Sequence, residues 1–489
     1  MRVSDHYGLG LSQPVLEFLD VDLSTDTRVF VDPYAFRFID TPWAREATSL
    51  LQDFYSQVSR AVRTGDDDHA MYLLANLSEP NEAHLGLSRG RSRGSGVSGG
   101  LARTLIDAFT SSPAVAQGLV DELEESVLFI ENIGHDRLSD MTINIVRRPL
   151  IAFTQEMCDR YGIDLVPDLD SGQMWDRQRH EWYAEHVDLP MPESKLLLIP
   201  KAVVRKTNTF DPGEYLQHFV LPYLQRRELE TPNSPLVQQR APKRGKPGDL
   251  YVTKKSIRKD REKRTGDDSA KPWNTEVTAE RPELLSEYRK TAKKKTEPPS
   301  HEDLARATDT PLPDWADLLR SVEEVAPGRK GADDYHWAIQ NLLDALFFPS
   351  LTTPQREFEI HEGRKRIDIR YVNQAESGFF HWVREVHHVP SSLVVVECKN
   401  YAGALSNPEF DQLTGRFSRE RGQLGLLCYR GFADQKANVI SRCRDTALDG
   451  RGYVLPLDDA DLRHLVETRD ETGETQFEFL IERFIQIIS

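Results

Sequence analysis

Three residues in the last third of the chain combine types and spacing that could support metal-dependent hydrolysis. Asp368 lies in the alternating segment 364–371 (RKRIDIRY), and Glu397 and Lys399 lie at the end of the next apolar run. Alternate side chains share one face of a strand, so Glu397 and Lys399 are expected to point one way and Cys398 the other. If the two strands pair, Asp368 comes beside Glu397.

Two carboxylates at one strand end suit a hard divalent cation, which prefers oxygen ligands and keeps water in its remaining positions. The lysine on that face can orient or help to deprotonate an attacking water, and the metal can stabilise charge that develops on a phosphate. An acidic residue and an ExK triplet also occur often by chance. The apolar run before Glu397 and the basic run before Asp368 favour the catalytic interpretation, because charges are costly to bury without a purpose.

The segments around this set predict alternating helices and strands. Helices are expected at 336–348, 408–417 and 439–449, and strands at 364–371, 393–398, 425–429 and 453–457. The segment Arg356 to Glu362 (REFEIHE) also alternates and could supply a further strand. This order predicts a mixed α/β sandwich.

The pattern of Asp368, a gap of 28 residues and Glu397-x-Lys399 after an apolar strand resembles the PD-(D/E)xK motif. That motif defines the restriction endonuclease-like nuclease superfamily, which includes Mrr-type restriction enzymes and Holliday-junction resolvases. The resemblance covers about residues 330–460 and implies an α-β-β-β-α-β core. It also implies that Asp368, Glu397 and the carbonyl of Cys398 bind Mg²⁺ or Mn²⁺, and that Lys399 acts near the attacking water.

Further site residues follow from the same resemblance. Gln412, on the helix after the motif, resembles a glutamine that several of these families carry beside the lysine and is assigned a catalytic role. Four cations around the motif could contact phosphates: Arg364, Lys365, Arg366 and Arg416.

The chain departs from the family pattern at two points. Ile367 stands where the motif name has a proline. The acid that often lies on the first helix is left open between Asp334, Gln340 and Asp344, because helical spacing does not choose between them.

The whole chain divides by composition into three parts. Residues 1–230 are expected to form a separate α+β domain, with helices at 47–64, 147–161 and 214–228 and a buried strand at 195–204. Residues 231–310 are rich in Pro, Lys and Arg and too poor in apolar residues for a core of their own, which predicts a basic linker or arm. Within it, 280–294 could be helical when docked. Residues 311–489 form the expected nuclease domain.

The formal net charge of −16 argues against a protein that coats nucleic acid indiscriminately. Residues 241–300, however, contain 17 Lys and Arg against 10 Asp and Glu, a net of +7, which leaves −23 for the rest. A local basic surface is therefore compatible with a nucleic-acid partner.

The four cysteines include no CxxC pair, which favours free thiols in a reducing compartment and argues against structural zinc. No apolar run is long enough to cross a bilayer, and the N-terminus lacks the pattern of a signal peptide. A cytoplasmic protein without a membrane partner is expected.

These observations predict a Mg²⁺- or Mn²⁺-dependent endonuclease that hydrolyses phosphodiester bonds, with DNA as the expected substrate. By analogy with the resembling families, restriction or anti-phage defence in a bacterium is the expected context. The N-terminal region would select the substrate, sense a trigger or mediate assembly, and homo-oligomerisation is left open.

Two alternatives remain. One is a catalytically inactive, nuclease-fold protein that binds DNA or acts as a scaffold. The other places an independent enzyme or nucleotide sensor in the N-terminal region, with sites in the Gly- and Arg-rich segment 87–100 and the polar segment 134–140.

Overall fold

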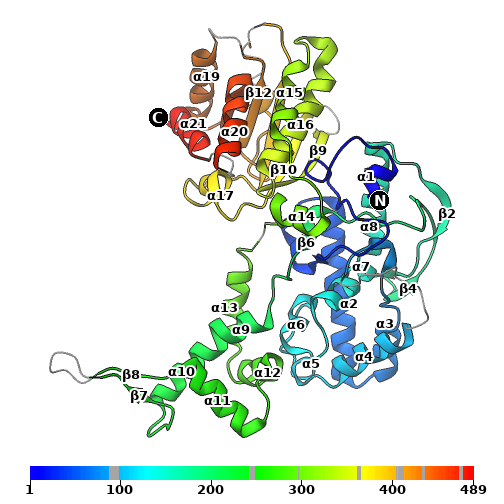
Figure 1. Ribbon diagram of the computed structural model, residues 1–489, viewed down its shortest axis with the longest axis vertical. Helices are drawn as coiled ribbons and strands as arrows, with labels where there is room; N and C mark the ends of the chain where they lie inside the picture. Colours follow the sequence, from blue (N-terminus) through cyan, green and yellow to red (C-terminus); the bar gives the residue numbers. More distant parts are fainter. Residues whose placement is uncertain are drawn as a thin grey trace.

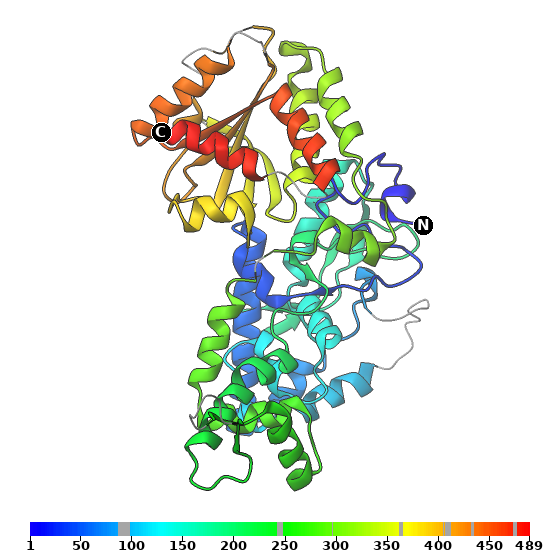
Figure 2. The same ribbon diagram turned by 60° about the vertical axis from the view of Figure 1, so that its left-hand side comes forward.

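Two hydrophobic cores organise the computed structural model of the chain (Figure 1). The structure describes residues 1–86, 98–241, 248–295, 297–360, 365–403, 405, 412–431, 435–472 and 477–489. The first core is built mainly by the N-terminal unit and a helical arm, and the second by the C-terminal unit. Figure 2 shows the C-terminal unit at one end of an elongated molecule and the arm at the other.

The N-terminal unit is mostly helical, with three small two-stranded sheets. Its helices are α1 (Val3–His6), α2 (Pro42–Thr64), α3 (Asp67–Leu74), α4 (Ser98–Thr110), α5 (Pro113–Ala116), α6 (Ser126–Phe129), α7 (His135–Ile145) and α8 (Arg147–Tyr161). The sheets pair β1 (Phe30–Val31) with β6 (Val204–Arg205), β2 (Val166–Asp170) with β5 (His186–Leu189), and β3 (Met174–Asp176) with β4 (Glu181–Tyr183).

The long helix α2 forms the centre of this unit, and its limits follow from its capping residues. The Thr41 side chain accepts from the Ala44 backbone N–H, Pro42 occupies the first turn, and Gly65 ends the helix with φ of 70°. The predicted helix at 47–64 is confirmed and begins five residues earlier than expected, because the Thr41–Pro42 start signal lies upstream of the apolar periodicity.

The predicted strand at 195–204 is wrong over most of its length. Its apolar residues are buried as expected, but the backbone N–H of Leu197 donates to Glu82 and that of Leu198 to the Thr154 hydroxyl. Pro200 has no N–H to donate, and a short 3-10 helix follows at Lys201–Val203. Only the last residue, Val204, enters a strand. The segment is buried among loops and helices rather than in a sheet.

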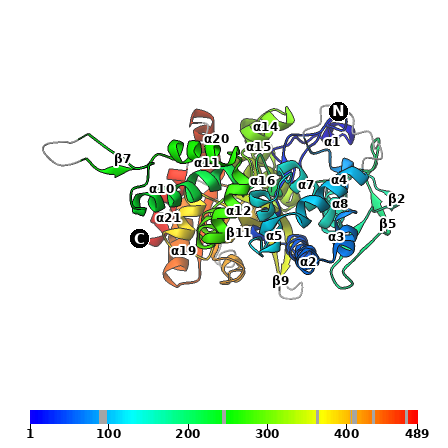
Figure 3. The ribbon, with the colours of Figure 1, turned by 90° about the horizontal axis from the view of Figure 1, so that it is seen from below.

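Much of the region 231–310, expected to be a linker or an arm, folds into helices, and the segment expected to be helical when docked, 280–294, contains α13 (Glu283–Ala292). Together with the helices that precede it from residue 212, this region forms a helical arm. The arm comprises α9 (Pro212–Tyr215), a π-helical turn (Leu216–Val220), α10 (Leu221–Glu230), β7 (Gln238–Gln239), β8 (Leu250–Tyr251), α11 (Lys254–Thr265), α12 (Ala270–Glu280), α13 (Glu283–Ala292) and α14 (His301–Thr308). The few apolar residues of the arm, among them Trp273, Leu285 and Tyr288, pack into the first core. The arm is therefore stabilised by the core that it shares with the N-terminal unit. The β7–β8 hairpin projects from the arm (Figure 3).

The C-terminal unit is the mixed α/β structure that the sequence predicts. It contains α15 (Trp315–Glu324), α16 (Ala332–Phe347), β9 (Leu351–Ile360), β10 (Lys365–Asn373), α17 (Gly378–Glu385), β11 (Leu393–Lys399), β12 (Leu424–Tyr429), α19 (Lys436–Leu448), β13 (Tyr453–Asp458), α20 (Asp459–Thr472) and α21 (Phe477–Ile488). The five-stranded sheet has the order β13-β12-β11-β10-β9. Residues 356–360 of the segment that could supply a further strand are part of β9, and residues 361–362 lie outside the described residues.

The sheet changes direction at β11. This strand pairs antiparallel with β10 and parallel with β12, and β12 pairs parallel with β13. Helices α15, α16 and α20 contact one another on one side of the sheet, whereas α17 and α19 each contact α21 on the other side (Figure 1). Because both faces are covered, β11 and β12 are buried at every position, which explains their continuous apolar sequences.

A buried ion pair fixes two helices to the parallel edge of the sheet. The guanidinium of Arg483 on α21 donates two hydrogen bonds of 3.0 Å to Asp461 on α20 and a third of 2.9 Å to the carbonyl of Pro456 on β13. Both side chains are buried. Such a pair is strongly destabilising when only one partner is removed, since the other charge is left buried alone.

We expect Asp461→Ala to lower the free energy of unfolding by roughly 3–5 kcal/mol, measured by urea titration. Asp317→Ala is the matched control, because Asp317 forms an exposed ion pair with Arg320 within α15 that should contribute under about 1 kcal/mol. Equal effects of the two substitutions would contradict the structural importance of the buried pair.

The two units meet through polar and apolar contacts around the end of α16. Phe348 belongs to the first core although it follows α16, and the ammonium of Lys201 lies 4.6 Å from its ring centroid. The Nε2–H of His301 on α14 donates to the carbonyl of Ala345 at 3.1 Å. Burial, followed by the nearby Lys201 charge, lowers the pKa of His301 to about 3. His301 is therefore neutral in the folded protein.

This neutral histidine predicts a pH-dependent contribution to stability. In the unfolded chain the imidazole takes a proton as the pH falls below its ordinary pKa of 6.5, whereas in the folded chain it does not. Stability from this group is thus complete above pH 6.5 and is lost as the pH falls towards 3. At one pH unit below the ordinary pKa, the loss is about 1.4 kcal/mol.

His301→Gln, which keeps a neutral donor, should reduce the loss of unfolding free energy between pH 7.5 and 5.5 by about that amount. His464→Gln on the exposed face of α20 is the control and should leave the loss unchanged. An unaltered pH profile for His301→Gln would disprove the assignment.

Candidate functional site

The antiparallel pairing of β10 and β11 brings the predicted catalytic residues together. Ile369 pairs with Val396, so the next positions of the two strands are Asp368, in the middle of β10, and Glu397, near the end of β11. Here the carboxylate of Asp368 turns to the neighbouring backbone and accepts a hydrogen bond of 2.8 Å from the N–H of Cys398. Asp368 and the Glu397–Lys399 segment therefore form one site.

The second carboxylate of the site is enclosed by two cations. Glu397 is fully buried, and its Oε1 accepts a hydrogen bond of 2.5 Å from the ammonium of Lys399. Its other oxygen forms an ion pair with the guanidinium of Arg416. Lys399 and Arg416 each retain 9% exposure. The two cations compensate the buried negative charge and hold the carboxylate in place.

Arg416, which the sequence predicts to contact phosphates, lies inside the site and pairs with Glu397. Burial lowers its pKa, and the charge of Asp368 acts in the opposite direction. Gln412, one helical turn earlier, is exposed, and no hydrogen bond joins it to the other site residues within the described part of the chain. The segment before Gln412 lies outside the described residues.

The other expected phosphate-contacting residues lie near the start of β10. Arg366 is exposed and forms ion pairs of 3.1 and 3.3 Å with Glu357 and Glu359 on β9. The side chain of Lys365 and the whole of Arg364 lie outside the described residues.

A histidine that the sequence analysis did not single out reaches the site from α16. The Nε2 of His336 lies 3.9 Å from Oδ2 of Asp368. Among the described residues, ligand atoms of His336, Asp368 and Cys398 all lie within 4.8 Å of one another, close enough for a possible shared metal. The signal available in the sequence was the position of His336 in the first turns of the helix that precedes the strands. The Cys398 thiol is a poor ligand there, because burial raises its pKa well above the ordinary value.

The three candidates for the first-helix acid occupy different environments. Asp334 is exposed near the start of α16. Gln340 and Asp344 are buried, and the hydroxyl of Tyr371 on β10 donates to Asp344 at 2.7 Å. Burial raises the pKa of Asp344 to about 6, and the charge of Lys201 opposes this. Asp344 thus belongs to the contact between the two units, whereas His336 is the residue of α16 that approaches Asp368.

Of the two segments considered for a separate N-terminal site, the structure describes the second in full and only the end of the first. Most of segment 87–100, residues 87–97, lies outside the described residues. Segment 134–140 is the N-cap and first turns of α7, and His135 accepts a hydrogen bond of 3.2 Å from the Asn208 N–H. Burial, together with neighbouring carboxylates, raises the pKa of Asp140 to about 8.

Comparisons with known proteins extend over the N-terminal unit alone. The family described as a domain of unknown function (DUF8370) matches residues 8–211. No curated protein and no solved structure matches the chain. No helix within the described ranges combines the length and apolar composition that a bilayer-spanning segment needs. The four cysteines are free thiols, all of them buried.

The ion pair between Glu397 and Arg416 can be tested through stability. We expect Arg416→Met to lower the free energy of unfolding by about 2–3 kcal/mol, because Glu397 keeps only Lys399 as a partner. Arg419→Met is the matched control on the exposed surface nearby and should change the urea midpoint little. A value near zero for Arg416→Met would show that the pair does not form.

Proposed function

We propose that the chain is a metal-dependent endonuclease that hydrolyses phosphodiester bonds at the site formed by Asp368, Glu397 and Lys399. The observation that carries this proposal is the meeting of Asp368, in the middle of β10, with the Glu397-x-Lys399 segment at the end of the paired strand β11. A carboxylate, a second carboxylate and a lysine within one partly enclosed site are the groups that such hydrolysis requires.

The arrangement of the C-terminal unit supports the same proposal. Helix α16 precedes β9, β10 and β11, and β12, α19 and β13 follow, so the antiparallel half of the sheet adjoins a parallel half. The helix and the first three strands fit the start of the α-β-β-β-α-β core that the PD-(D/E)xK resemblance implies, and the helix expected at 408–417, between β11 and β12, lies partly outside the described residues. We therefore assign the unit to that class of nuclease as part of the proposal.

The donor set fits a hard cation of the Mg²⁺ or Mn²⁺ type. Asp368 uses one oxygen for the Cys398 N–H and lies at a partly exposed position, with a side-chain exposure of 16%. Asp368 would hold the ion with the Cys398 carbonyl, and Glu397, which lies outside the cluster of His336, Asp368 and Cys398, would join them once it leaves its two cations. His336 would add a nitrogen donor, which favours Mn²⁺ over Mg²⁺. When bound, the ion would supply charge stabilisation for the phosphate and a more acidic water.

The protein side chains have separable roles in this proposal. Lys399, held against Glu397, would orient the attacking water and move a proton from it. Arg416 can exchange its partner, because the oxygens of an entering phosphate accept from a guanidinium as the Glu397 carboxylate does. This exchange would release Glu397 towards the cation while Arg416 binds the substrate.

DNA is the proposed substrate, and the arm is a proposed second contact with it. Lys255, Lys259 and Lys263 recur every four residues on α11, and all three are exposed. Such a row can follow backbone phosphates and would make binding strongly dependent on salt. The N-terminal unit would then select the substrate, respond to a trigger or mediate assembly, in keeping with a role in restriction or anti-phage defence.

A non-cleaving DNA-binding or scaffold protein is the second candidate. The specific observation in its favour is that both oxygens of Glu397 are engaged by cations, which leaves Asp368 as the less occupied carboxylate. A protein fixed permanently in this arrangement would bind phosphate without cutting it.

The test is cleavage of plasmid and linear DNA with Mg²⁺ or Mn²⁺, comparing the wild type with Asp368→Asn and Lys399→Met. We expect cutting by the wild type and a loss of at least about a hundredfold in each variant, because a metal ligand or proton-transfer group is removed. Mn²⁺ should support cutting at least as well as Mg²⁺. Asp317→Asn, at an exposed position of α15, should cut like the wild type.

Cutting that survives both substitutions would contradict the assigned site. DNA binding without cutting, in all proteins and with either metal, would favour the second candidate. Circular dichroism spectra of the variants would establish that each one has folded.

A further inference from the structure

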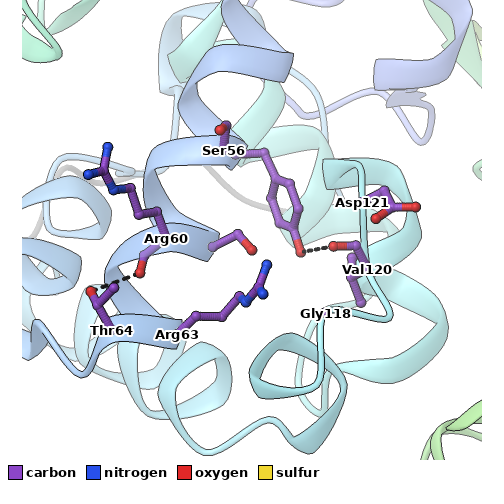
Figure 4. A pocket seen from close by; sticks show the side chains of 9 residues that line it. Ser56, Arg60, Arg63, Thr64, Gly118, Val120 and Asp121 are labelled. Carbon is purple, nitrogen blue, oxygen red and sulfur yellow. Dashed lines mark hydrogen bonds between the residues drawn. The ribbon is translucent and has the colours of Figure 1, made fainter.

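We propose that the N-terminal unit binds a small phosphorylated ligand in a pocket beside the C-terminal half of α2, a function separate from the nuclease site. The pocket has a volume of about 420 Å³, within the usual size range for small-molecule sites. Figure 4 shows it between α2 and the loop that follows α5. Its lining residues are Tyr55, Ser56, Ser59, Arg60, Arg63, Thr64, Gly118, Val120 and Asp121.

One wall of the pocket is a polar face of α2. Ser56, Ser59, Arg60 and Arg63 follow one another at intervals of three, one and three residues, which places them on the same side of a helix. Hydroxyl groups and guanidinium groups are donors, and guanidinium binds phosphate oxygens in a bidentate geometry. The helix face therefore offers the donors that a phosphate group needs.

The opposite wall is a loop that is held in place from both sides. The hydroxyl of Tyr55 donates to the carbonyl of Val120 at 3.3 Å, which ties the loop to α2 (Figure 4). On the other side, Asp121 forms an ion pair of 2.7 Å with Arg289 of α13. The pocket is thus formed before a ligand arrives, which lowers the entropic cost of binding.

Gly118 allows the loop to approach Arg63 closely. Its φ is +67°, a conformation that favours glycine, and a Cβ built on it would lie 3.6 Å from the Cζ of Arg63. In Figure 4 the Arg63 side chain extends towards this loop, whereas Arg60 lies at the opposite rim and points away from it. Arg63 is accordingly the principal anchor, and Arg60 is a secondary one.

The charges around the pocket favour an anion. Both Arg60 and Arg63 are exposed, and neither side chain forms an ion pair or hydrogen bond with another described residue. Arg289 pairs with both Asp121 and Glu125, so it compensates Asp121 only in part, but the pocket lining still carries two arginines against one carboxylate. The ring of Tyr55 is buried and offers no stacking surface, so recognition is expected to depend on the phosphate rather than on a base.

The test is isothermal titration of the full-length protein with adenosine monophosphate, with inorganic phosphate and with adenosine. We expect the two phosphate-bearing probes to bind and adenosine not to bind. Arg63→Ala should weaken binding tenfold or more, because a charge-assisted bidentate contact is lost. Arg63→Lys, which keeps the charge but not the planar fork, should also weaken it.

Arg45→Ala is the matched control, because Arg45 is an exposed arginine on the same helix that pairs with Asp40 outside the pocket. Its binding should equal that of the wild type. Undiminished binding by Arg63→Ala would overturn the proposal. Failure of both phosphate-bearing probes to bind would also overturn it. If a short single-stranded oligonucleotide then bound through Arg63, the pocket would be a contact for a nucleic-acid backbone and not a small-ligand site. None of these outcomes depends on cleavage at Asp368.

Discussion

The buried charge of Glu397 is the constraint on which the C-terminal unit depends. A carboxylate without water contact is strongly unfavourable unless it is paired, and here Lys399 and Arg416 both pair with it. Lys399 comes from the same strand, but Arg416 comes from the segment between β11 and β12. The requirement to compensate one charge therefore positions that segment over the strand end, next to Asp368.

Sequence reasoning predicts the C-terminal unit well because its strands carry unambiguous local signals. The continuous apolar run at 393–398 corresponds to β11, and the alternating segment at 364–371 corresponds to β10. The two strands are consecutive along the chain, which favours their pairing. The sequence does not specify which way each charged side chain turns at a strand end. It also does not specify how α16 packs against the sheet. His336 was missed because its distance to Asp368 depends on that packing.

The N-terminal half is harder to predict because its elements depend on tertiary contacts. The apolar run at 195–204 has the composition of a strand, yet its backbone bonds go to loops and to a threonine hydroxyl. The region 231–310 has too few apolar residues for a core, yet it folds because Trp273 and Tyr288 enter the core of another unit. The composition of these segments shows how many apolar residues they contain. It does not show which other parts of the chain they pack against.

The contact between the two units has a consequence for how such a chain can evolve. Phe348, Val372 and Leu393 belong to the C-terminal unit by sequence but to the first core by packing. Tyr371, on the same strand as Asp368, bonds to Asp344, whose charge interacts with Lys201. The C-terminal unit is therefore not an exchangeable module. A recombination event near residue 310 would expose apolar surface unless the new N-terminal partner carried a matching one, so the two halves should be inherited together.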